Sequence, residues 1–582
     1  MLKTILRQVK QYRTTAILTP VWTTAEVIMG VLIPYVTASI IDKGINAGDI
    51  TNVYKYGALM IFLSCLSLLF GVLSGWCSAH SSSGLAANLR EAMYRNIQKF
   101  SFSDIDKFST AGLVTRMTTD VSNIQNAFQM LLRTSFRAPL NMVSALFMCF
   151  FINGKLSIIF FVAMVILSTF LFVIISRVAK LFQQIFKKYD DLNAVVQENV
   201  TAIRVVKAYV RESHEISKFD KAVLSLFSLN VKAEALMTLN HPVMNLVSNG
   251  CIIAISWWGA HFIVGGELTT GQLTSLFSYI MTILGSLMML SMIIVSLTQS
   301  AASGKRVAEV IDEVPDMSDP ENPILSVKDG SVDISHVYFS YKAGGDYALE
   351  DINLHIDAGE TIGIIGGTGS GKSTLANLIP RLYDATEGSV KVGGEDVRSY
   401  SMDALRGEVA MVLQRNILFS GTILENLRWG KEDATLEECK EACRLSCADE
   451  FIESFPDGYD TLIDQGGTNV SGGQRQRLCI ARALLRRPKI LILDDSTSAV
   501  DTATDARIRE AFLRKIPGTT KIIISQRILS IKDADRIIVM DNGRVNGFGT
   551  HEELLKTNEI YSDIHALQSS GGEGDFDENK NQ

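Results

Sequence analysis

The segment 366–373, GGTGSGKS, has the residue types and spacing of a phosphate-binding loop. It fits the pattern G-x4-G-K-[ST] and follows a short buried-strand pattern at 361–365. The glycines let backbone N–H groups converge on phosphate oxygens, and the following helix adds its positive N-terminus. We expect Lys372 to reach the β and γ phosphates and Ser373 to ligate Mg²⁺. The predicted nucleotide-binding residues of this loop are Gly366, Gly367, Thr368, Gly369, Ser370, Gly371, Lys372, Ser373 and Thr374.

A second segment, LILDDSTSAVD at 491–501, ends a predicted buried strand with two carboxylates. Asp494 is expected to hold the metal through water. The next position is where a hydrolase needs a long general base, and here it is the short Asp495. Its carboxylate sits about 1 Å or more further back than that of Glu, and a misplacement of that size can cost on the order of 10²-fold in rate. The pattern therefore predicts a nucleotide site that binds well but hydrolyses poorly.

The rest of the chain must position these residues, and it divides by composition. At 582 residues it is too long for one core, and the first ~300 residues hold nearly charge-free apolar runs. These predict a membrane all-α domain of six transmembrane helices with long cytoplasmic extensions, followed by an α/β P-loop domain. The predicted spans are 16–40, 57–79, 138–153, 156–177, 243–264 and 273–297.

Charge predicts the orientation in the membrane. The opening MLKTILRQVKQYR has four basic residues and no acidic one, which favours a cytoplasmic N-terminus; with six spans, both termini are then cytoplasmic. The inner connections 80–137 and 178–242 are charged and helical in pattern, so they should project nearly 40 Å into the cytoplasm. A net charge of −7 argues against nucleic-acid binding.

The cysteines favour neither disulfides nor a metal site. None of the eight has CxxC spacing, and Cys439, Cys443 and Cys447 recur every four residues without a His or a fourth Cys. We interpret these three as a small-residue packing stripe on one helix.

The phosphate loop alone could belong to a kinase or a GTPase, but a later segment favours another family. VSGGQRQR at 470–477 resembles the signature of ATP-binding cassette (ABC) proteins, with Val470 in place of Leu. The resemblance spans about residues 10–565. It implies an exporter half-transporter that uses ATP and Mg²⁺, with coupling helices near 101–120 and 193–212. It also implies functional residues: Tyr341 stacking on adenine, Gln414 of the Q-loop as a second Mg²⁺ ligand, Asp501 of the D-loop, and Ser471, Gly472, Gly473 and Gln474 acting in trans on a partner's ATP.

Two positions depart from the family pattern. The consensus general base is Glu, where this chain has Asp495, and the consensus switch residue is His, where it has Gln526. Gln can hydrogen-bond phosphate but carries no charge and cannot shuttle a proton. Since each ATP lies between the phosphate loop of one cassette and the signature of the other, we predict a heterodimer. Its partner would be a second half-transporter that carries the consensus Glu and His.

The predicted domains are a transmembrane domain at 1–305, a linker at 306–330, a cassette at 331–568 and a disordered acidic tail at 569–582. The expected location is a bacterial plasma membrane, in contact with lipids. Two alternatives stay open: a homodimeric lipid or peptide exporter, and an ABC regulator that does not pump.

Candidate cargo contacts lie in the spans. Glu26 in the first span could ligate a cationic substrate or make a structural bond to a neighbouring helix. Met288 and Met292 in the last span could line a cavity for substrate, although Met is also ordinary lipid-facing filler. Together these favour small hydrophobic or cationic drug-like cargo.

Overall fold

A computed structural model describes residues 1–342, 344–496 and 499–570. The chain divides into two compact units. One contains residues 1–98 and 109–314, and the other contains 99–108 together with the chain from 315 onward. Ser498 of the predicted D-loop and most of the predicted tail, 571–582, lie outside the described residues.

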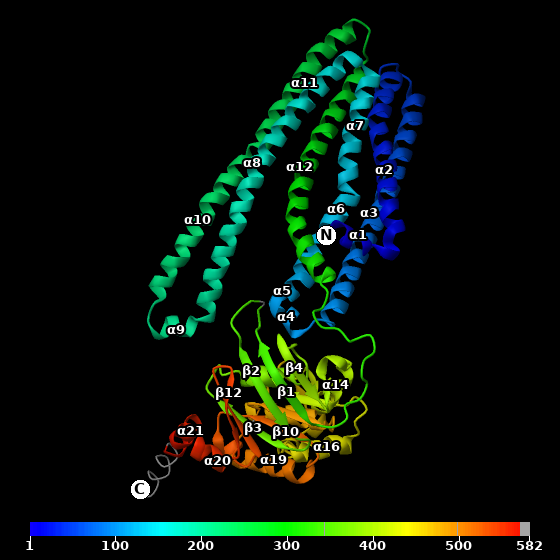
Figure 1. The fold of residues 1–582 in the computed structure, drawn as a ribbon. Coiled ribbons are helices and arrows are strands. Elements are labelled where there is room, and N and C mark those ends of the chain that lie inside the picture. The colour runs from blue at the N-terminus through cyan, green and yellow to red at the C-terminus, as the bar shows by residue number, and fades with distance from the viewer. Residues whose placement is uncertain (343, 497–498, 571–582) are drawn as a thin grey trace. The chain divides into compact units, whose positions relative to one another are not determined.

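The first unit is entirely helical in its described part, and six of its segments are long and apolar enough to cross a membrane: Lys10–Ile45, Ile50–Ile97, Thr110–Ile152, Gly154–Thr201, Glu212–Val264 and Thr270–Leu290. The predicted fold class is thereby confirmed. Its helices are α1 (Leu2–Arg7), α2 (Arg13–Ile40), α3 (Ile50–Ile97), α5 (Thr110–Thr115), α6 (Val121–Leu132), α7 (Thr134–Ile152), α8 (Gly154–Thr201), α9 (Ile203–Ala208), α10 (Glu212–Thr238), α11 (Asn240–Val264) and α12 (Thr270–Asp312) (Figure 1).

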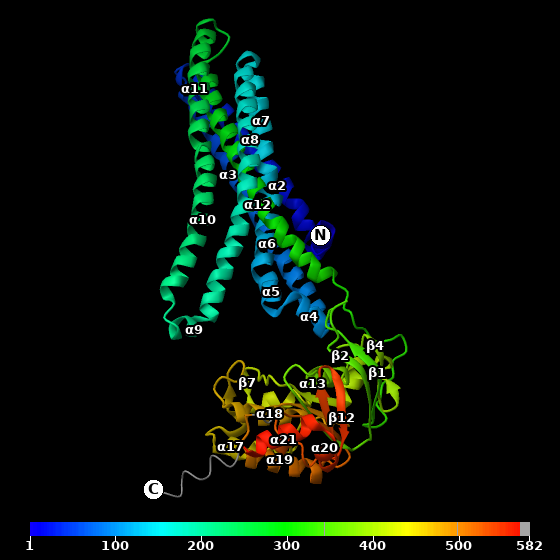
Figure 2. The same ribbon diagram turned by 60° about the vertical axis from the view of Figure 1, so that its left-hand side comes forward.

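Polar caps fix where the long helices begin. The Asp49 carboxylate accepts from the backbone of Thr51 at the start of α3, and Asn153 caps α8 in the same way. Thr269 and Gln272 form a reciprocal capping box at the start of α12. Such caps satisfy N–H groups that the helix itself leaves unpaired. Helices α8 and α10 lie side by side and are joined by the short α9, as Figures 1 and 2 show.

The described residues of the second unit form two larger sheets and a two-stranded one. The antiparallel sheet has the order β2-β1-β4-β5, and the mainly parallel sheet has the order β12-β11-β3-β10-β9-β6. The strands are β1 (Val332–Phe339), β2 (Leu349–Ile356), β3 (Thr361–Gly366), β4 (Glu387–Val392), β5 (Glu395–Asp396), β6 (Val409–Val412), β7 (Gly421–Thr422), β8 (Leu462–Ile463), β9 (Ile490–Asp494), β10 (Thr520–Ile524), β11 (Arg536–Asp541) and β12 (Arg544–Gly549).

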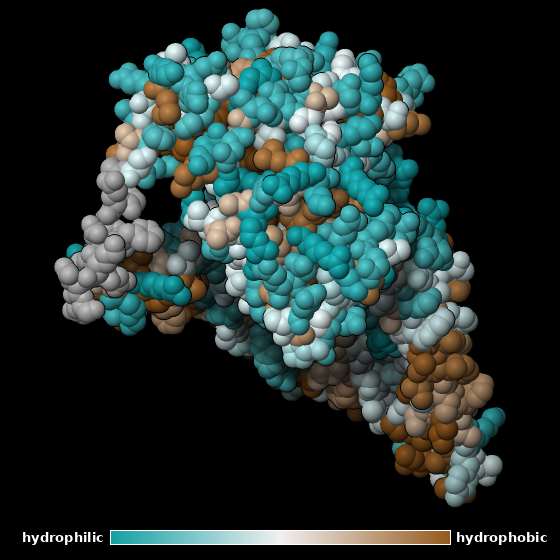
Figure 3. Space-filling model, turned by 90° about the horizontal axis from the view of Figure 1, so that it is seen from below, coloured by the Kyte–Doolittle hydropathy of each residue, from teal (hydrophilic) through white to brown (hydrophobic). Residues whose placement is uncertain are grey.

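Helices cover this framework, and one of them comes from the N-terminal half of the chain. Helix α4 (Phe102–Phe108) belongs to the second unit, although it lies between α3 and α5 in the sequence. The face in Figure 3 is mostly hydrophilic over this unit. The remaining helices are α13 (Lys372–Leu378), α14 (Met402–Glu408), α15 (Ile423–Arg428), α16 (Leu436–Leu445), α17 (Asp449–Ser454), α18 (Gly472–Leu484), α19 (Thr502–Lys515), α20 (His551–Thr557) and α21 (Glu559–Ser570).

The parallel strands are buried on both faces, which explains their unbroken apolar runs. In β9, Ile490 and Ile492 pack into one hydrophobic cluster, whereas Leu491 and Leu493 pack into another. Successive strand side chains point to opposite faces, so the sheet lies between two cores. Cys439, Cys443 and Cys447 are all buried in the second of these clusters. The strands between these cores are held in fixed register, and this register positions the candidate site.

Candidate nucleotide site

The carboxyl ends of three neighbouring strands meet at one edge of the parallel sheet. Ile524 at the end of β10 is in register with Ile364 of β3 on one side and with Asp494 of β9 on the other. The loop after β3, the segment 525–527 and the carboxylate pair therefore lie side by side. Ligands bind at this edge of open α/β sheets because the loops diverge there.

Glycine is required where the phosphate loop turns into α13. Gly371 has φ +97°, and a Cβ there would come within 3.0 Å of the Ala348 carbonyl oxygen. Only glycine takes up this backbone conformation without strain. The turn presents the N-terminus of α13 to the loop, and this end of a helix favours phosphate.

The Lys372 side chain folds back over the phosphate loop and bonds to its backbone. Its Nζ donates to the carbonyl oxygens of Gly366 at 2.9 Å and Gly367 at 2.6 Å. Burial lowers the pKa of its ammonium, while the carboxylates of Asp494 and Asp495 oppose that shift. A phosphate entering the loop would replace these bonds to neutral carbonyl oxygens with bonds to charged oxygens, which are stronger.

Ser373 and Asp494 form a pair of oxygen donors. The Ser373 hydroxyl donates to Asp494 Oδ1 at 3.0 Å, and the carboxylate is only 5% exposed. Burial raises the pKa of Asp494, and Asp495 adds to this rise, while the Ser373 bond and Lys372 oppose it. Hard oxygen donors near a buried carboxylate suit Mg²⁺, which prefers few protein ligands plus substrate phosphates. The residues present therefore fit the expected ion.

Asp495 begins the turn after β9 in a left-handed backbone conformation, with φ +47°. Its N–H donates to the Ile524 carbonyl at 3.0 Å, which ties the turn to β10. Burial raises the pKa of its carboxyl, while a hydrogen bond from Gln414 and the charges of Arg527 and Lys372 oppose that rise. Gln414, the predicted Q-loop residue, thus bonds to Asp495, which is at the position expected for the general base.

Gln526 is exposed and is the second residue after the end of β10. Helix α21 holds this segment by two hydrogen bonds. Gln568 of α21 donates from Nε2 to the Gln526 carbonyl at 2.7 Å and accepts from the Ile528 N–H at 2.8 Å. Sequence analysis missed Gln568, because a glutamine near the end of the last helix gives no signal of a contact with the segment after β10.

Tyr341 is half exposed and is held by a hydrogen bond and two aromatic neighbours. Its hydroxyl is 2.9 Å from Thr374 Oγ1, at the start of α13, and the residue is 51% exposed. Phe339 and Tyr383 pack edge-on against the ring, with centroids 4.8 and 5.3 Å away. A half-exposed aromatic ring that its neighbours hold in place can stack on a purine. Tyr383 was not predicted from sequence.

The signature segment forms the N-terminus of α18. Ser471 Oγ accepts from the Gln474 N–H at 3.2 Å, and Gln474 Oε1 accepts from the Ser471 N–H at 2.9 Å. A Cβ on Gly473 would meet the Ala499 carbonyl oxygen at 2.8 Å. Gln476 Oε1 accepts from the Ala499 N–H at 3.0 Å, so the signature helix and the D-loop are joined.

The D-loop ends by capping the next helix. Asp501 accepts from the Thr504 N–H at 2.9 Å at the start of α19. Backbone and side-chain hydrogen bonds from Thr504 lower the pKa of Asp501, which keeps this cap ionised.

Glu26 is buried in α2 beside two arginines. Its Oε1 lies 3.1 Å from the Arg137 guanidinium, and its Oε2 lies 3.9 Å from that of Arg133. A Cβ on Gly71 of α3 would meet the carboxylate at 3.2 Å, so the neighbouring helix packs closely against it. A buried charge is normally paired with an opposite charge, and the two arginines supply that pairing for Glu26. In α12, Met288 packs on the core of the first unit and Met292 is exposed.

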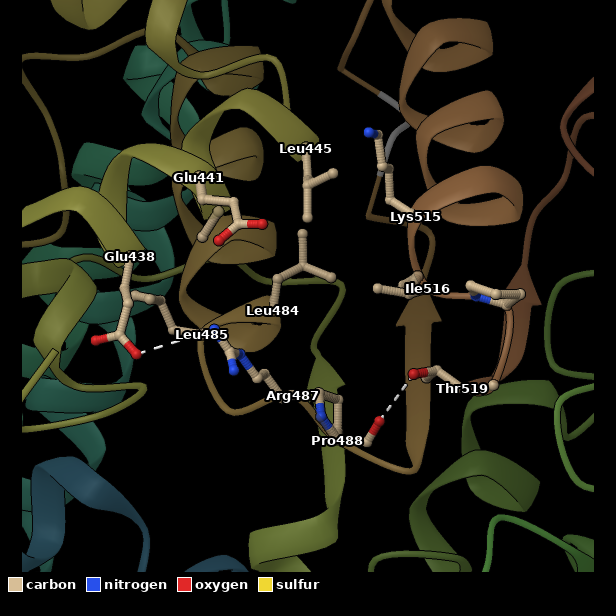
Figure 4. Close-up of a pocket in the computed structure, with 13 residues that line it drawn as sticks. Glu438, Glu441, Leu445, Leu484, Leu485, Arg487, Pro488, Lys515, Ile516 and Thr519 are labelled. Atoms are coloured by element: carbon tan, nitrogen blue, oxygen red, sulfur yellow. Dashed lines mark hydrogen bonds and ion pairs between the residues drawn. The ribbon is translucent and has the colours of Figure 1, made fainter. Parts of the chain in front are cut away.

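The cavity of about 380 Å³ drawn in Figure 4 lies away from these residues. Pro488 and Thr519, which line it, precede β9 and β10, so the cavity lies near the amino ends of the strands. It therefore belongs to the edge of the sheet opposite the candidate nucleotide site.

Family models match both parts of the chain. The ABC transporter transmembrane region matches residues 17–287, and the ABC transporter model matches residues 349–498. Among solved structures, a bacterial Atm1-family ABC exporter with ATP bound is similar, with a TM-score of 0.80, 25% identity, and coverage of 96% of this chain and 99% of that one.

Curated relatives extend over most of the chain. The uncharacterized ABC transporter ATP-binding protein YfiB of Bacillus subtilis is 38% identical over 92% of this chain and 93% of its own. The uncharacterized ABC transporter ATP-binding protein Rv1273c of Mycobacterium tuberculosis is 36% identical over 98% of both. An ATP-dependent lipid A-core flippase of Desulfotalea psychrophila is 33% identical over 83% of this chain and 84% of its own.

Proposed function

The chain belongs to the ABC transporter family as an exporter half-transporter, and we propose that it works in a heterodimer whose main hydrolytic site is completed by a different chain. The observation that carries this proposal is the unequal quality of its two ATP-related faces. The side chains expected to bind phosphate and metal lie close together, and the signature helix has a capped N-terminus. In contrast, the positions of the general base and the switch residue hold Asp495 and Gln526.

Each residue of the binding face has a role that its contacts support. Lys372 would exchange its loop carbonyls for the β and γ phosphates, and Tyr341 would stack on adenine. Ser373 and Gln414 would hold Mg²⁺ directly, with Asp494 acting through water. The ion would neutralise phosphate charge and orient the terminal phosphate.

Hydrolysis at the phosphate-loop face is slow because the Asp495 side chain is too short to reach the attacking water. The Asp495 carboxylate bonds to Gln414, and a water attacking the γ phosphate would have to approach a side chain one methylene shorter than Glu. Gln526 is exposed and uncharged, so it offers hydrogen bonds but no positive charge for the transition state.

The signature face would act on the partner's ATP. Its capping box and its contact with Ala499 give a fixed helix N-terminus, which is the feature that stabilises phosphate charge in trans. Apolar side chains at the tip around α9 are also exposed, which favours a second chain packing there: Val200, Val205, Tyr209 and Val210.

The cargo we propose is small and hydrophobic. Met292 offers an adaptable apolar contact, whereas Glu26 is already held by Arg133 and Arg137, which weighs against its binding a cation. A homodimeric lipid exporter is the second candidate, favoured by the flippase relative and by the surplus positive charge of the Glu26, Arg133 and Arg137 cluster.

If Glu26 has only a structural role, Glu26→Gln should reduce efflux of a cationic and a neutral dye equally. A selective loss of the cationic dye would show charge recognition instead.

The chain is a multi-pass membrane protein, and we place it in a bacterial plasma membrane with both termini in the cytoplasm. The deciding experiment is native mass spectrometry of the tagged chain, gently extracted from the membranes of its source cell. A one-to-one complex with a different half-transporter is expected. Complexes that contain only copies of this chain would overturn the heterodimer and leave the homodimeric exporter or a non-pumping regulator.

A further inference from the structure

Tyr383 touches both the predicted adenine platform and the helix of the first intracellular loop. Its ring packs edge-on against Tyr341, with centroids 5.3 Å apart, and lies 5.9 Å from the ring of Phe102 in α4. Its hydroxyl donates to Asp106 Oδ2 at 2.9 Å. All four residues belong to the second compact unit. A single side chain therefore bridges the base-binding residue and α4.

Helix α4 has a second, separate attachment. The buried Asp104 accepts from the Ser101 N–H at 2.9 Å and from the Asp316 N–H at 3.4 Å, and Ser103 donates to Asp316 Oδ2 at 2.9 Å. These bonds tie the start of α4 to the linker. Phe102 and Asp106 themselves are exposed, so their contacts with Tyr383 can form or break without disturbing a packed core.

The Tyr383 hydroxyl is suited to act as a hydrogen-bond donor to Asp106. Burial and the neighbouring Asp106 carboxylate raise the pKa of its hydroxyl, so the group stays protonated and donates. Tyr341 is half exposed and anchored through its hydroxyl at Thr374. A purine stacked on the Tyr341 ring would restrict it, and the perpendicular contact would pass that restriction to Tyr383. Aromatic pairs are sensitive to such geometry.

We propose that Tyr383 is a positioning residue that couples base stacking on Tyr341 to the placement of α4. The nucleobase would then be a signal to the first intracellular loop, alongside the phosphates sensed at Gln414 and Asp494. This inference rests on the proposed nucleotide binding. Couplings between protein sites commonly change an equilibrium five- to 150-fold, and one exposed aromatic contact belongs at the low end of that range.

The test measures hydrogen exchange of residues 99–108 in the full complex in nanodiscs, with saturating ATP or CTP. CTP keeps the triphosphate but offers a smaller ring for stacking. In the wild type, ATP should protect the segment about fivefold more than CTP. Tyr383→Phe, which keeps the ring but loses the bond to Asp106, should remove most of that difference and leave the ATP affinity within about twofold.

Two further variants separate coupling from folding. Asp106→Ala combined with Tyr383→Phe should behave like either single variant, because both remove one shared bond. Tyr347→Phe is the matched control, since its hydroxyl also donates to a carboxylate, that of Glu387, and it should change nothing. Equal protection by bound ATP and CTP in the wild type, or a full difference in Tyr383→Phe, would overturn the proposal and leave nucleotide binding intact. Failure to bind either nucleotide would instead refute the proposed function itself.

Discussion

The polar groups of the phosphate-loop face and those of the signature face of the cassette have different kinds of hydrogen-bond partner. At the phosphate loop, Lys372 bonds to two loop carbonyls, and Ser373 bonds to the buried Asp494. These are partners that a nucleotide and its metal ion can replace. At the signature, Ser471 and Gln474 satisfy each other, and the helix end needs no replacement to be ordered.

This difference separates the capacity to bind from the capacity to assist hydrolysis. In the proposed function, the first face holds ATP but has a short base, and the second face acts on a phosphate bound to another chain. The two faces should therefore respond to different variants, and each of the following predictions changes one face without the other.

The largest effect is expected from Lys372→Ala. Charge-assisted hydrogen bonds contribute about 1.5–3 kcal/mol each, so losing those from Lys372 to phosphate should weaken ATP binding on the order of 10²-fold or more. Titration of the isolated chain with a fluorescent ATP analogue measures this. Lys391→Ala, on an exposed position of β4, is the matched control. Unchanged affinity in Lys372→Ala would place the nucleotide elsewhere.

The double variant Asp495→Glu with Gln526→His should come next. Restoring the longer carboxylate and a chargeable switch residue should raise hydrolysis at this chain's own phosphate-loop site on the order of 10²-fold. The measurement is ATP turnover in a complex whose partner has lost its own base. Asp403→Glu, at an exposed position of α14, controls for added bulk. No gain would mean that the short base does not limit this site.

A smaller loss is expected from Gly473→Ala in the signature. Its Cβ would press on the Ala499 carbonyl at 2.8 Å, so the helix end or the D-loop must shift. Turnover of the complex should fall on the order of tenfold, because small misplacements at a catalytic site are costly. ATP affinity of the isolated chain should not change. Gly407→Ala is the control, since a Cβ there meets nothing within 4 Å.

The prediction of a binding face rests on a local pattern in the sequence. Residues 366–373 are contiguous, and their spacing alone implies a loop, a lysine and a hydroxyl near one anion. The apolar runs likewise predicted six spans and two buried strands, because burial on all sides leaves few polar positions. Local patterns of this kind need no knowledge of distant contacts.

The contacts of Tyr383, Gln568 and Glu26 could not be predicted in the same way. Tyr383 meets Asp106 across 277 positions of sequence, and Gln568 meets Gln526 across 42. Glu26 had two open interpretations, and its ion pairs with arginines at the junction of α6 and α7 depend on how three helices pack. No periodicity or motif records such pairings, because they arise only when the elements assemble.

Gln568→Ala is expected to have the smallest effect and tests whether the switch segment needs its support from α21. Both of its bonds go to backbone groups of 526–528, and a typical hydrogen bond contributes about 1 kcal/mol. The segment would stay in place through β10 but move more, so turnover in the complex should fall about two- to threefold with unchanged ATP affinity. Hydrogen exchange at 525–530 should rise in parallel. A loss of turnover without greater exchange would mean that Gln568 acts on the nucleotide site by another route than the switch segment. An effect as large as that of Gly473→Ala would mean that the phosphate-loop face, despite its short base, limits the cycle as strongly as the signature does.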